Sequence, residues 1–252
     1  MATTNDNALA RQALYRLASL ALADPRAGSW EHLAEPATRE TALVAAEVLR
    51  GDSDARPGSL GQGEQPLETL DTAALFEHLP DSAEAFEAAH GGIFGLVVSS
   101  PACPSHEGDY VPEKQVFQQS HALADVSGFY RAFGLTPARQ FPQRPDHISA
   151  ELEFMSCLVA LEQAADESQE QERIVLCRDA QRRFLEEHLA WWVPTFARLL
   201  WLEAGANSFH GAVAALLAAL IPAERGLLGV ATPSEEAQPA QPAGPNECEG
   251  CR

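Results

Sequence analysis

The sequence predicts an all-α protein, a single bundle-like domain of helices joined by long proline-containing loops. Apolar residues make up 46% of the chain and are mostly Ala and Leu, whereas the β-branched and aromatic residues that strands prefer are sparse. Along most of the chain the apolar residues recur with the period of an α-helix. A chain of 252 residues can bury one substantial core. We therefore expect a helical domain over residues 1–228 and a tail over residues 229–252.

Each helix is predicted from its apolar spacing and from the helix-breaking residues beside it. The first carries Leu9, Leu14 and Leu17 on one face. It ends at Asp24, because proline follows. Further helices are expected over residues 30–49, 67–79, 83–98, 113–133, a stretch that begins after Asp146, 170–187, 194–203 and 207–220. The large aromatic residues expected to pack in the core or between helices are Trp191, Trp192, Phe196 and Trp201.

Three segments are expected to be loops. Residues 51–66 contain four Gly and two Pro without apolar periodicity, which is typical of a flexible surface loop. Residues 99–112 and 135–145 carry prolines that favour extended backbone, and they display ionisable and aromatic side chains. We expect function to reside at these two loops. Residues 229–252 are rich in Pro, Ala, Gln and Glu, so we expect the tail to be disordered.

The net charge narrows the range of partners. The chain has 36 acidic and 17 basic residues, so its formal net charge is −19. Such a protein repels nucleic acid and attracts a basic peptide. The simpler interpretation is that the acidity only keeps the protein soluble.

The sequence indicates a cytoplasmic protein. The first residues show no basic segment followed by an apolar core, so no secretory signal is expected. The longest apolar run, residues 212–221, is shorter than the roughly 20 residues that span a bilayer. Five cysteines in a chain of this length do not suggest a disulfide framework.

Common catalytic motifs are absent from the sequence. No glycine-rich phosphate loop, Gly-x-Ser-x-Gly elbow or His-Glu-x-x-His helix occurs. Glu87 and His90 form one Glu-x-x-His pair, but a di-metal bundle needs two such pairs and two further carboxylates. We expect a protein that is not an enzyme.

A metal-binding or redox-sensing helical protein is the alternative. Cys248 and Cys251 have the spacing of half a structural zinc site, and Cys103 with His106 would supply the other half if the tail folded back. The simpler interpretation makes the tail cysteines an exposed reducible pair. Cys157 and Cys177 are then ordinary small core residues.

Several polar residues surround the two proline loops. Gln118, His121 and Asp125 are three and four apart, so they form a polar seam on their helix. Asp146 is a plausible N-cap, and Glu151 suits the positive end of the helix dipole. Singly, these residues have such structural roles. Together they indicate an acidic, aromatic-edged groove suited to an arginine-rich peptide.

A series of short motifs carries a family resemblance. In chain order they are Cys103–Glu107 with Tyr110, Val116–Gln119, Ala124–Tyr130, Phe133–Leu135, Pro145–Ile148 and Glu151–Met155. In order and spacing they resemble the TorD, DmsD and NarJ-like chaperones that mature redox enzymes. The nearest resemblance is to the subgroup that serves periplasmic molybdoenzymes similar to dimethyl sulfoxide reductase.

The resemblance implies an all-helical cytoplasmic chaperone for the catalytic subunit of a molybdenum oxidoreductase. It would bind the twin-arginine leader, assist insertion of the molybdenum cofactor and prevent premature export. No tightly bound cofactor is implied, only transient contact with the molybdenum cofactor or a guanine nucleotide, and zinc belongs to the alternative above. The identity of the client and the choice between monomer and homodimer stay open.

The same resemblance implies the residues that contact the leader or client. They are Glu107, Tyr110, Gln118, His121, Asp125, Phe129, Pro145, Asp146, His147 and Glu151. Asp125 and Asp146 would pair with arginines, and the aromatic residues Tyr110 and Phe129 would contact the apolar part of the leader. His147 would tune the site with pH.

Overall fold

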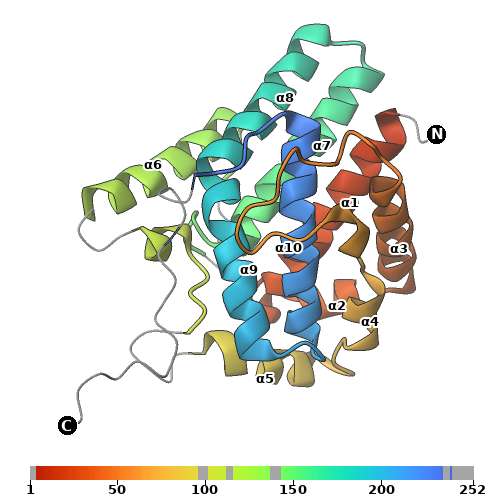
Figure 1. The fold of residues 1–252 in the computed structure, drawn as a ribbon, viewed down its shortest axis with the longest axis vertical. Coiled ribbons are helices and arrows are strands. Elements are labelled where there is room, and N and C mark those ends of the chain that lie inside the picture. The colour runs from red at the N-terminus through yellow and green to blue at the C-terminus, as the bar shows by residue number, and fades with distance from the viewer. Residues whose placement is uncertain (1–3, 96–101, 112–115, 137–142, 235–238, 240–252) are drawn as a thin grey trace.

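The computed structural model describes residues 4–95, 102–111, 116–136, 143–234 and 239, and it confirms the all-α prediction (Figure 1). No strand forms within these residues, although His106 and His147 make one isolated bridge. The longer helices are α1 (Thr4–Leu22), α3 (Pro36–Arg50), α5 (Ala83–Phe94), α6 (Val116–Ala132), α7 (Ile148–Glu167), α8 (Gln171–Phe184), α9 (Ala190–Ala204) and α10 (Phe209–Leu228). The shorter ones are η1 (Pro25–Ala27), α2 (Ser29–Leu33), η2 (Leu67–Thr69), α4 (Ala73–Glu77), η3 (Glu107–Tyr110) and η5 (Leu185–Leu189).

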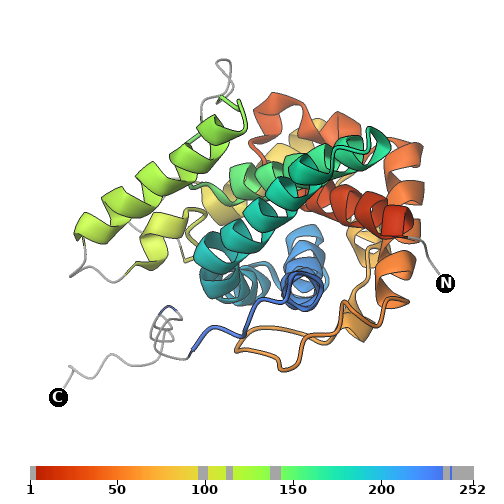
Figure 2. The ribbon, with the colours of Figure 1, turned by 90° about the horizontal axis from the view of Figure 1, so that it is seen from above.

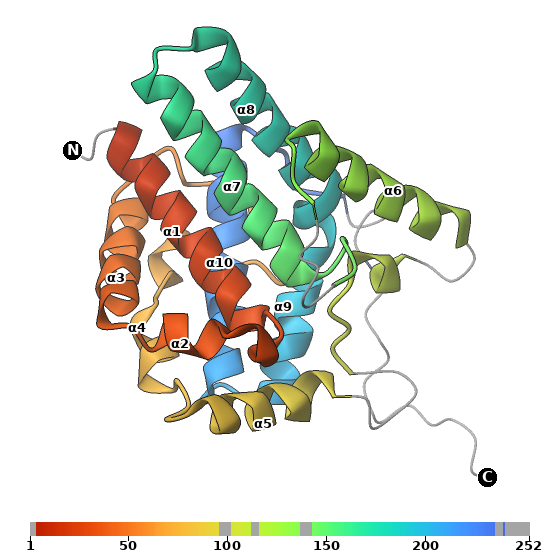
Figure 3. The ribbon, with the colours of Figure 1, turned by 180° about the vertical axis from the view of Figure 1, so that it is seen from behind.

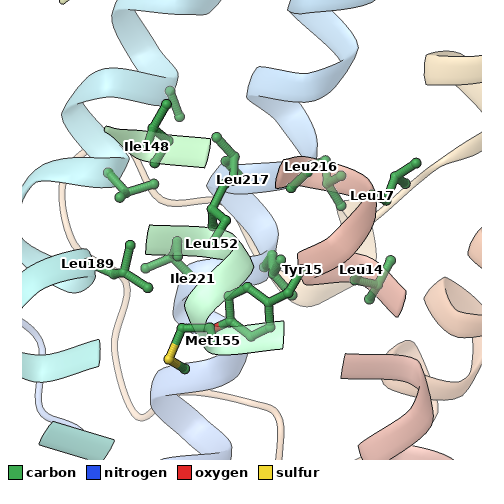
Figure 4. Close-up of a cluster of buried hydrophobic side chains, with 14 of the residues drawn as sticks. Leu14, Tyr15, Leu17, Ile148, Leu152, Met155, Leu189, Leu216, Leu217 and Ile221 are labelled. Carbon is green, nitrogen blue, oxygen red and sulfur yellow. The ribbon is translucent and has the colours of Figure 1, made fainter. Parts of the chain in front are cut away.

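The helices pack around α10. α10 lies along α9, α1 packs against α7 and α3, and α7 packs against α8. Figure 2 shows α6 on one side of the bundle and α3 on the opposite side, while Figure 3 shows α7 between α1 and α8. Figure 4 shows the centre of the core, where side chains of α1, α7 and α10 meet. The buried residues there include Leu14, Tyr15, Leu152, Met155, Leu217 and Ile221.

α10 is long and apolar enough to cross a membrane by length and composition. Within the described part of the chain it is the one helix that meets these criteria, and 83% of its most apolar stretch is buried inside the protein. The continuous apolar surface of α10 is therefore used by the core, with α9 as its main neighbour.

The predicted end of α10 at residue 220 is wrong, because the helix continues through Pro222 to Leu228. Proline removes the donor that the carbonyl of Ala218 would use within the helix. That carbonyl instead accepts the backbone N–H of Gln65 at 2.8 Å. A neighbouring segment thus satisfies the group that Pro222 leaves free, and Gly229 in a left-handed conformation ends the helix.

Other helix boundaries also differ from the prediction. The helix expected over 30–49 is divided, since α2 ends at Leu33 and α3 begins with Pro36 at its first position. Residues 67–79 form only η2 and α4, because the backbone is extended at Leu70.

α8, η5 and α9 follow one another without a break. The expected start at Pro194 is therefore wrong, since this residue lies inside α9. The aromatic packing is confirmed for Trp192 and Phe196, which are fully buried. It is wrong for Trp201, whose exposure is 46% because it lies on the outer face of α9.

Residues 51–66 are free of helix, as predicted, but they lie against α10. The guanidinium of Arg225 binds both carboxylate oxygens of buried Glu64 and donates to the carbonyl of Ser59 at 2.9 Å. A Cβ on Gly226 would lie only 2.9 Å from the carbonyl carbon of Ala55, so glycine is needed there. Flexibility of this loop stays a prediction.

The first residues of the expected tail also pack on the domain. Val230 is buried and the hydroxyl of Thr232 is 2.6 Å from that of Ser59. Residues 235–238 and 240–252 lie outside the described part of the chain, so the disorder expected there stays a prediction.

A second buried ion pair joins the first and last helices. Arg11 of α1 donates to both carboxylate oxygens of Glu224 in α10, at 2.8 and 2.7 Å. It also donates to the side-chain oxygen of Gln181 in α8 at 2.7 Å. Because Glu224 is fully buried, the charge of Arg11 and these hydrogen bonds make its burial tolerable.

We expect the substitution Arg11→Met to lower the free energy of unfolding by about 3–5 kcal/mol, because it leaves the Glu224 carboxylate buried without a counter-charge. Urea denaturation measures the change. Arg16→Met, on an exposed position of the same helix, is the control. The double variant Arg11→Met, Glu224→Leu should regain most of the loss. A cost for Arg11→Met no larger than that of the control would contradict this account.

Candidate functional site

The described residues 102–111 and 143–145 of the two loops that were expected to carry function lie side by side. The N–H of Glu107 donates to the carbonyl of Asp146 at 2.9 Å, and the N–H of Ile148 donates to the carbonyl of Ser105 at the same distance. The rings of His106 and His147 pack edge to face with centroids 5.1 Å apart. Residues 102–111 and 143–148 therefore form one unit at the start of α7.

Asp146 holds this unit together from the inside. Only 1% of the residue is exposed, and its carboxylate accepts the N–H of Gly108 at 3.2 Å. Arg144 forms a two-point ion pair with it, at 3.0 and 2.6 Å. The prediction that Asp146 is the N-cap of α7 is wrong, because its carboxylate points back to the other loop.

His147 is the N-cap instead. Its Nδ1 accepts the backbone N–H of Ser149 at 3.2 Å. Burial, together with the neighbouring histidines His106 and His90, lowers the pKa of His147 to about 3. The ring is therefore neutral at physiological pH, as its role as an acceptor requires.

Glu107 begins a polar chain that leads from the core to the surface. Its carboxylate, 1% exposed, accepts the indole N–H of Trp191 at 2.9 Å and lies 3.2 Å from Nδ1 of His188. The other ring nitrogen of His188 is 3.4 Å from the carboxylate of Asp125, whose side chain is 59% exposed. Glu107 is thus the buried end of this chain of contacts, and Asp125 is the end that faces solvent.

Glu151 is a second buried carboxyl group. One of its oxygens accepts the indole N–H of Trp192 at 3.3 Å, and the other has no hydrogen-bond partner. Burial raises the pKa of Glu151 well above its usual range, and the charges of Glu107 and Asp146 raise it further. Position 151 is in the first turn of α7, as expected, but its side chain points into the core.

The aromatic members of the predicted set have mainly structural contacts. The hydroxyl of Tyr110 donates to the carbonyl of Pro104 at 2.8 Å, and its ring packs on Trp192. Pro145 is fixed in the same manner, since its carbonyl accepts the hydroxyl of Tyr130 at 2.7 Å. Phe129 is only half buried, with its ring centroid 5.5 Å from that of His188.

Asp125 is therefore the exposed member of the predicted set within the described structure, and Phe129 and Pro145 are partly accessible to a partner. Glu107, Asp146 and Glu151 are buried supports. The side chains of Gln118 and His121 lie outside the described residues, so their roles stay predictions.

Only part of the predicted Cys3His set is described. Cys103 is fully buried with its sulfur 3.8 Å from the carbonyl of Phe196, and burial raises the pKa of this thiol. His106 is 3.5 Å from the carboxylate of Asp109. Cys248 and Cys251 lie outside the described residues, so this zinc site stays a prediction. Cys157 and Cys177 are partly buried and buried, as expected for packing residues.

Sequence reasoning missed the side-chain partners of Glu107 and Asp146. His188 and Trp191 complete the chain from Glu107, and Arg144 neutralises Asp146. The signal that was available is His188 directly after two glutamates and shortly before two tryptophans, within a helical stretch. Nothing in the sequence indicates that this stretch lies against residues about eighty positions earlier.

Comparisons with known proteins identify a family and several relatives of this chain. The family described as "Nitrate reductase delta subunit" matches residues 61–198, more than half of the chain and the whole of the described site. A perchlorate reductase assembly chaperone from Dechloromonas aromatica is 37% identical over 113 residues, which are 45% of this chain and 48% of that relative. A selenate reductase assembly chaperone from Thauera selenatis is 30% identical over 151 residues, 60% of this chain and 74% of the relative.

A third relative, the chaperone protein TorD of Photobacterium profundum, is 33% identical over 107 residues, 41% of this chain and 47% of the relative. The chain thus spans about half the length of two of these three relatives. No solved structure matches the chain.

The helical fold and these relatives define a class, the assembly chaperones of reductases, and this class is not catalytic. Within it, the chain belongs to the nitrate reductase delta subunit family, the family of TorD and NarJ-like maturation chaperones. The resemblance drawn from the sequence motifs is confirmed.

Glu151→Gln is expected to reduce the loss of stability that occurs as pH rises. A carboxyl group whose pKa is raised by folding stabilises the folded state below about pH 4.5, and this contribution is lost as pH rises toward the folded pKa. The wild type should therefore lose about 1.4 kcal/mol more than the variant for each pH unit over which the carboxyl stays protonated. Urea denaturation at pH 5 and pH 8 measures this difference, and equal losses in both proteins would contradict it.

His147→Asn should have the opposite pH dependence. The folded pKa of His147 lies below its ordinary value of 6.5, so its contribution is complete above that pH and is lost as pH falls. Asparagine also caps helices well but does not titrate. Between pH 6.5 and pH 5 the variant should lose less stability than the wild type, by about 1.4 kcal/mol per pH unit. Thermal or urea unfolding at several pH values would reveal parallel curves if the account were incorrect.

Proposed function

We propose that this protein is a cytoplasmic chaperone that binds the twin-arginine leader of the catalytic subunit of a molybdenum oxidoreductase. Membership of the family and relatives named as assembly chaperones of perchlorate and selenate reductases support a client of that class. The chaperone holds the apoprotein while the molybdenum cofactor is inserted, and so prevents premature export. Contact with the cofactor or with a guanine nucleotide is transient.

The observation that carries the proposal is the exposed carboxylate of Asp125, held beside the half-buried ring of Phe129 on α6. A guanidinium binds a carboxylate through two parallel hydrogen bonds and also stacks on aromatic faces. Arg183 already lies over this ring, with its guanidinium carbon 5.5 Å from the ring centroid. The surface of α6 at Phe129 therefore suits an arginine side chain.

A neighbouring hollow suits the apolar part of a leader. It has a volume of about 500 Å³ and lies between α6 and the residues that follow and precede the 137–142 segment. Its lining includes Leu123, Ala124, Tyr130, Leu135 and Pro145. Apolar grooves beside polar anchoring groups are a common way of binding peptides.

The buried residues of the site have a supporting role in this mechanism. Asp146, paired with Arg144, and His147, capping α7, hold the two loops against each other. Glu107 fixes the orientation of His188, which in turn contacts Asp125. The net charge of −19 attracts a basic leader over longer distances.

Calorimetric titration with a twin-arginine leader peptide from a molybdoenzyme encoded beside this chain tests the proposal. We expect binding to weaken about tenfold or more when both arginines are replaced by lysine, because lysine cannot form the two-point pair. Asp125→Asn should weaken binding of the arginine peptide to a similar extent, since it removes a charge-assisted hydrogen bond.

Asp166→Asn, on an exposed position at the far end of α7, is the matched control and should leave the affinity unchanged. Absence of binding to either peptide would place the client contact on the mature enzyme instead of its leader. Binding that is insensitive to Asp125→Asn would place the leader elsewhere on the chaperone.

A further inference from the structure

We propose that Asp125, Glu187 and His188 form a binding site for a divalent transition-metal ion of the zinc class. One ligand atom from each residue lies within 4.8 Å of the other two. This set uses none of the cysteines considered above. Among the described residues, it is the one group of three His, Cys, Asp or Glu side chains whose ligand atoms lie this close together.

The ring nitrogen of His188 points to a missing partner. His188 is 2% exposed, and its buried Nε2 has no hydrogen bond, although it lies 3.4 Å from an oxygen of Asp125. Two acceptors facing each other at this distance repel unless a proton or a cation lies between them. A tetrahedral ion with bonds of about 2.1 Å holds its ligand atoms about 3.4 Å apart, so the observed separation suits a shared ion.

The opposite side of the ring has the support that metal-binding histidines usually have. Nδ1 of His188 lies 3.2 Å from both oxygens of Glu107, a carboxylate that is itself fixed by the indole of Trp191. A carboxylate on one ring nitrogen sets the tautomer, leaves the other nitrogen free to bind a metal, and makes it a stronger ligand. Burial of Glu107 keeps this arrangement rigid.

The π-helical turn η5 places the adjacent residues Glu187 and His188 at the same site. Glu187 and His188 lie in η5, a single π-helical turn between α8 and α9. Such turns change the angle between successive side chains and occur frequently at functional sites. Asp125 comes from α6, so an ion would join α6 to the continuous α8–α9 helix.

Arg183 is the competing cation at this place. It binds the two oxygens of Glu187 at 3.2 and 3.4 Å, one helical turn away. Both side chains are substantially exposed, and exposed ion pairs of this spacing are weak. A divalent ion that also binds His188 therefore displaces Arg183 from Glu187 readily. Three protein ligands leave one position of a tetrahedral ion open.

The test is titration of the full-length chain with Zn²⁺ alone after removal of metal with a chelator. A background of Cys248→Ser and Cys251→Ser removes the tail thiols as alternative ligands. We expect one equivalent of Zn²⁺ to bind, and Asp125→Asn or Glu187→Gln to weaken it at least tenfold. Glu186→Gln is the matched control, because this exposed residue makes the same type of pair with Arg182 but lies outside the site. It should not change the affinity.

A second readout identifies the ligands. Co²⁺ bound in place of Zn²⁺ should give visible absorption bands without the intense near-ultraviolet band of thiolate ligands. Glu107→Gln should weaken binding 10- to 100-fold through His188. Absence of binding would overturn the proposal. Binding that is unaffected by Asp125→Asn and Glu187→Gln would also overturn it. Since no leader peptide is present, neither result depends on leader binding.

Discussion

Burial of α10 is the constraint on which the rest of this structure depends. The helix is so apolar that it must be covered along its length, and α9, α1 and the helix-free segment 51–66 cover it. Two consecutive charged residues near its end, Glu224 and Arg225, then need partners inside the protein. Arg11 from the first helix and Glu64 from the loop supply them. The polar contacts of α10 thus bring together segments from both ends of the chain.

The candidate site faces a related difficulty, because it keeps three acidic side chains out of water. Each is accommodated in a different manner: Asp146 pairs with a guanidinium, Glu107 contacts an indole and an imidazole, and Glu151 accepts the indole N–H of Trp192 while burial raises its pKa and so favours its neutral form. A cluster of three ionised carboxylates would be strongly destabilising. Differences in their partners allow the loops to pack closely at the start of α7.

The helices could be predicted from the periodic pattern of apolar residues, whereas the contacts between individual side chains could not. The apolar repeat identified most helices, because helix-forming tendency and burial agree along α1, α7 and α10. It was wrong at Pro222, since the donor that satisfies Ala218 comes from Gln65, far away in sequence. The motifs around Asp125 and Asp146 identified the family, which the comparisons confirm. They did not show that Asp146 is already paired with Arg144, or that His188 joins Glu107 to Asp125, because such contacts exist only after folding.

The adjacent indoles of α9 have a mechanical consequence. Trp191 donates to Glu107 of the 102–111 loop, whereas Trp192 donates to Glu151 of α7. Neighbouring residues on a helix point in different directions, so the two hydrogen bonds fix both the rotation of α9 about its axis and its position along that axis. A slide by one residue or a partial roll would break both bonds at once. If the two hydrogen bonds are kept when a partner binds, α9, the 102–111 loop and the start of α7 move together as one rigid body.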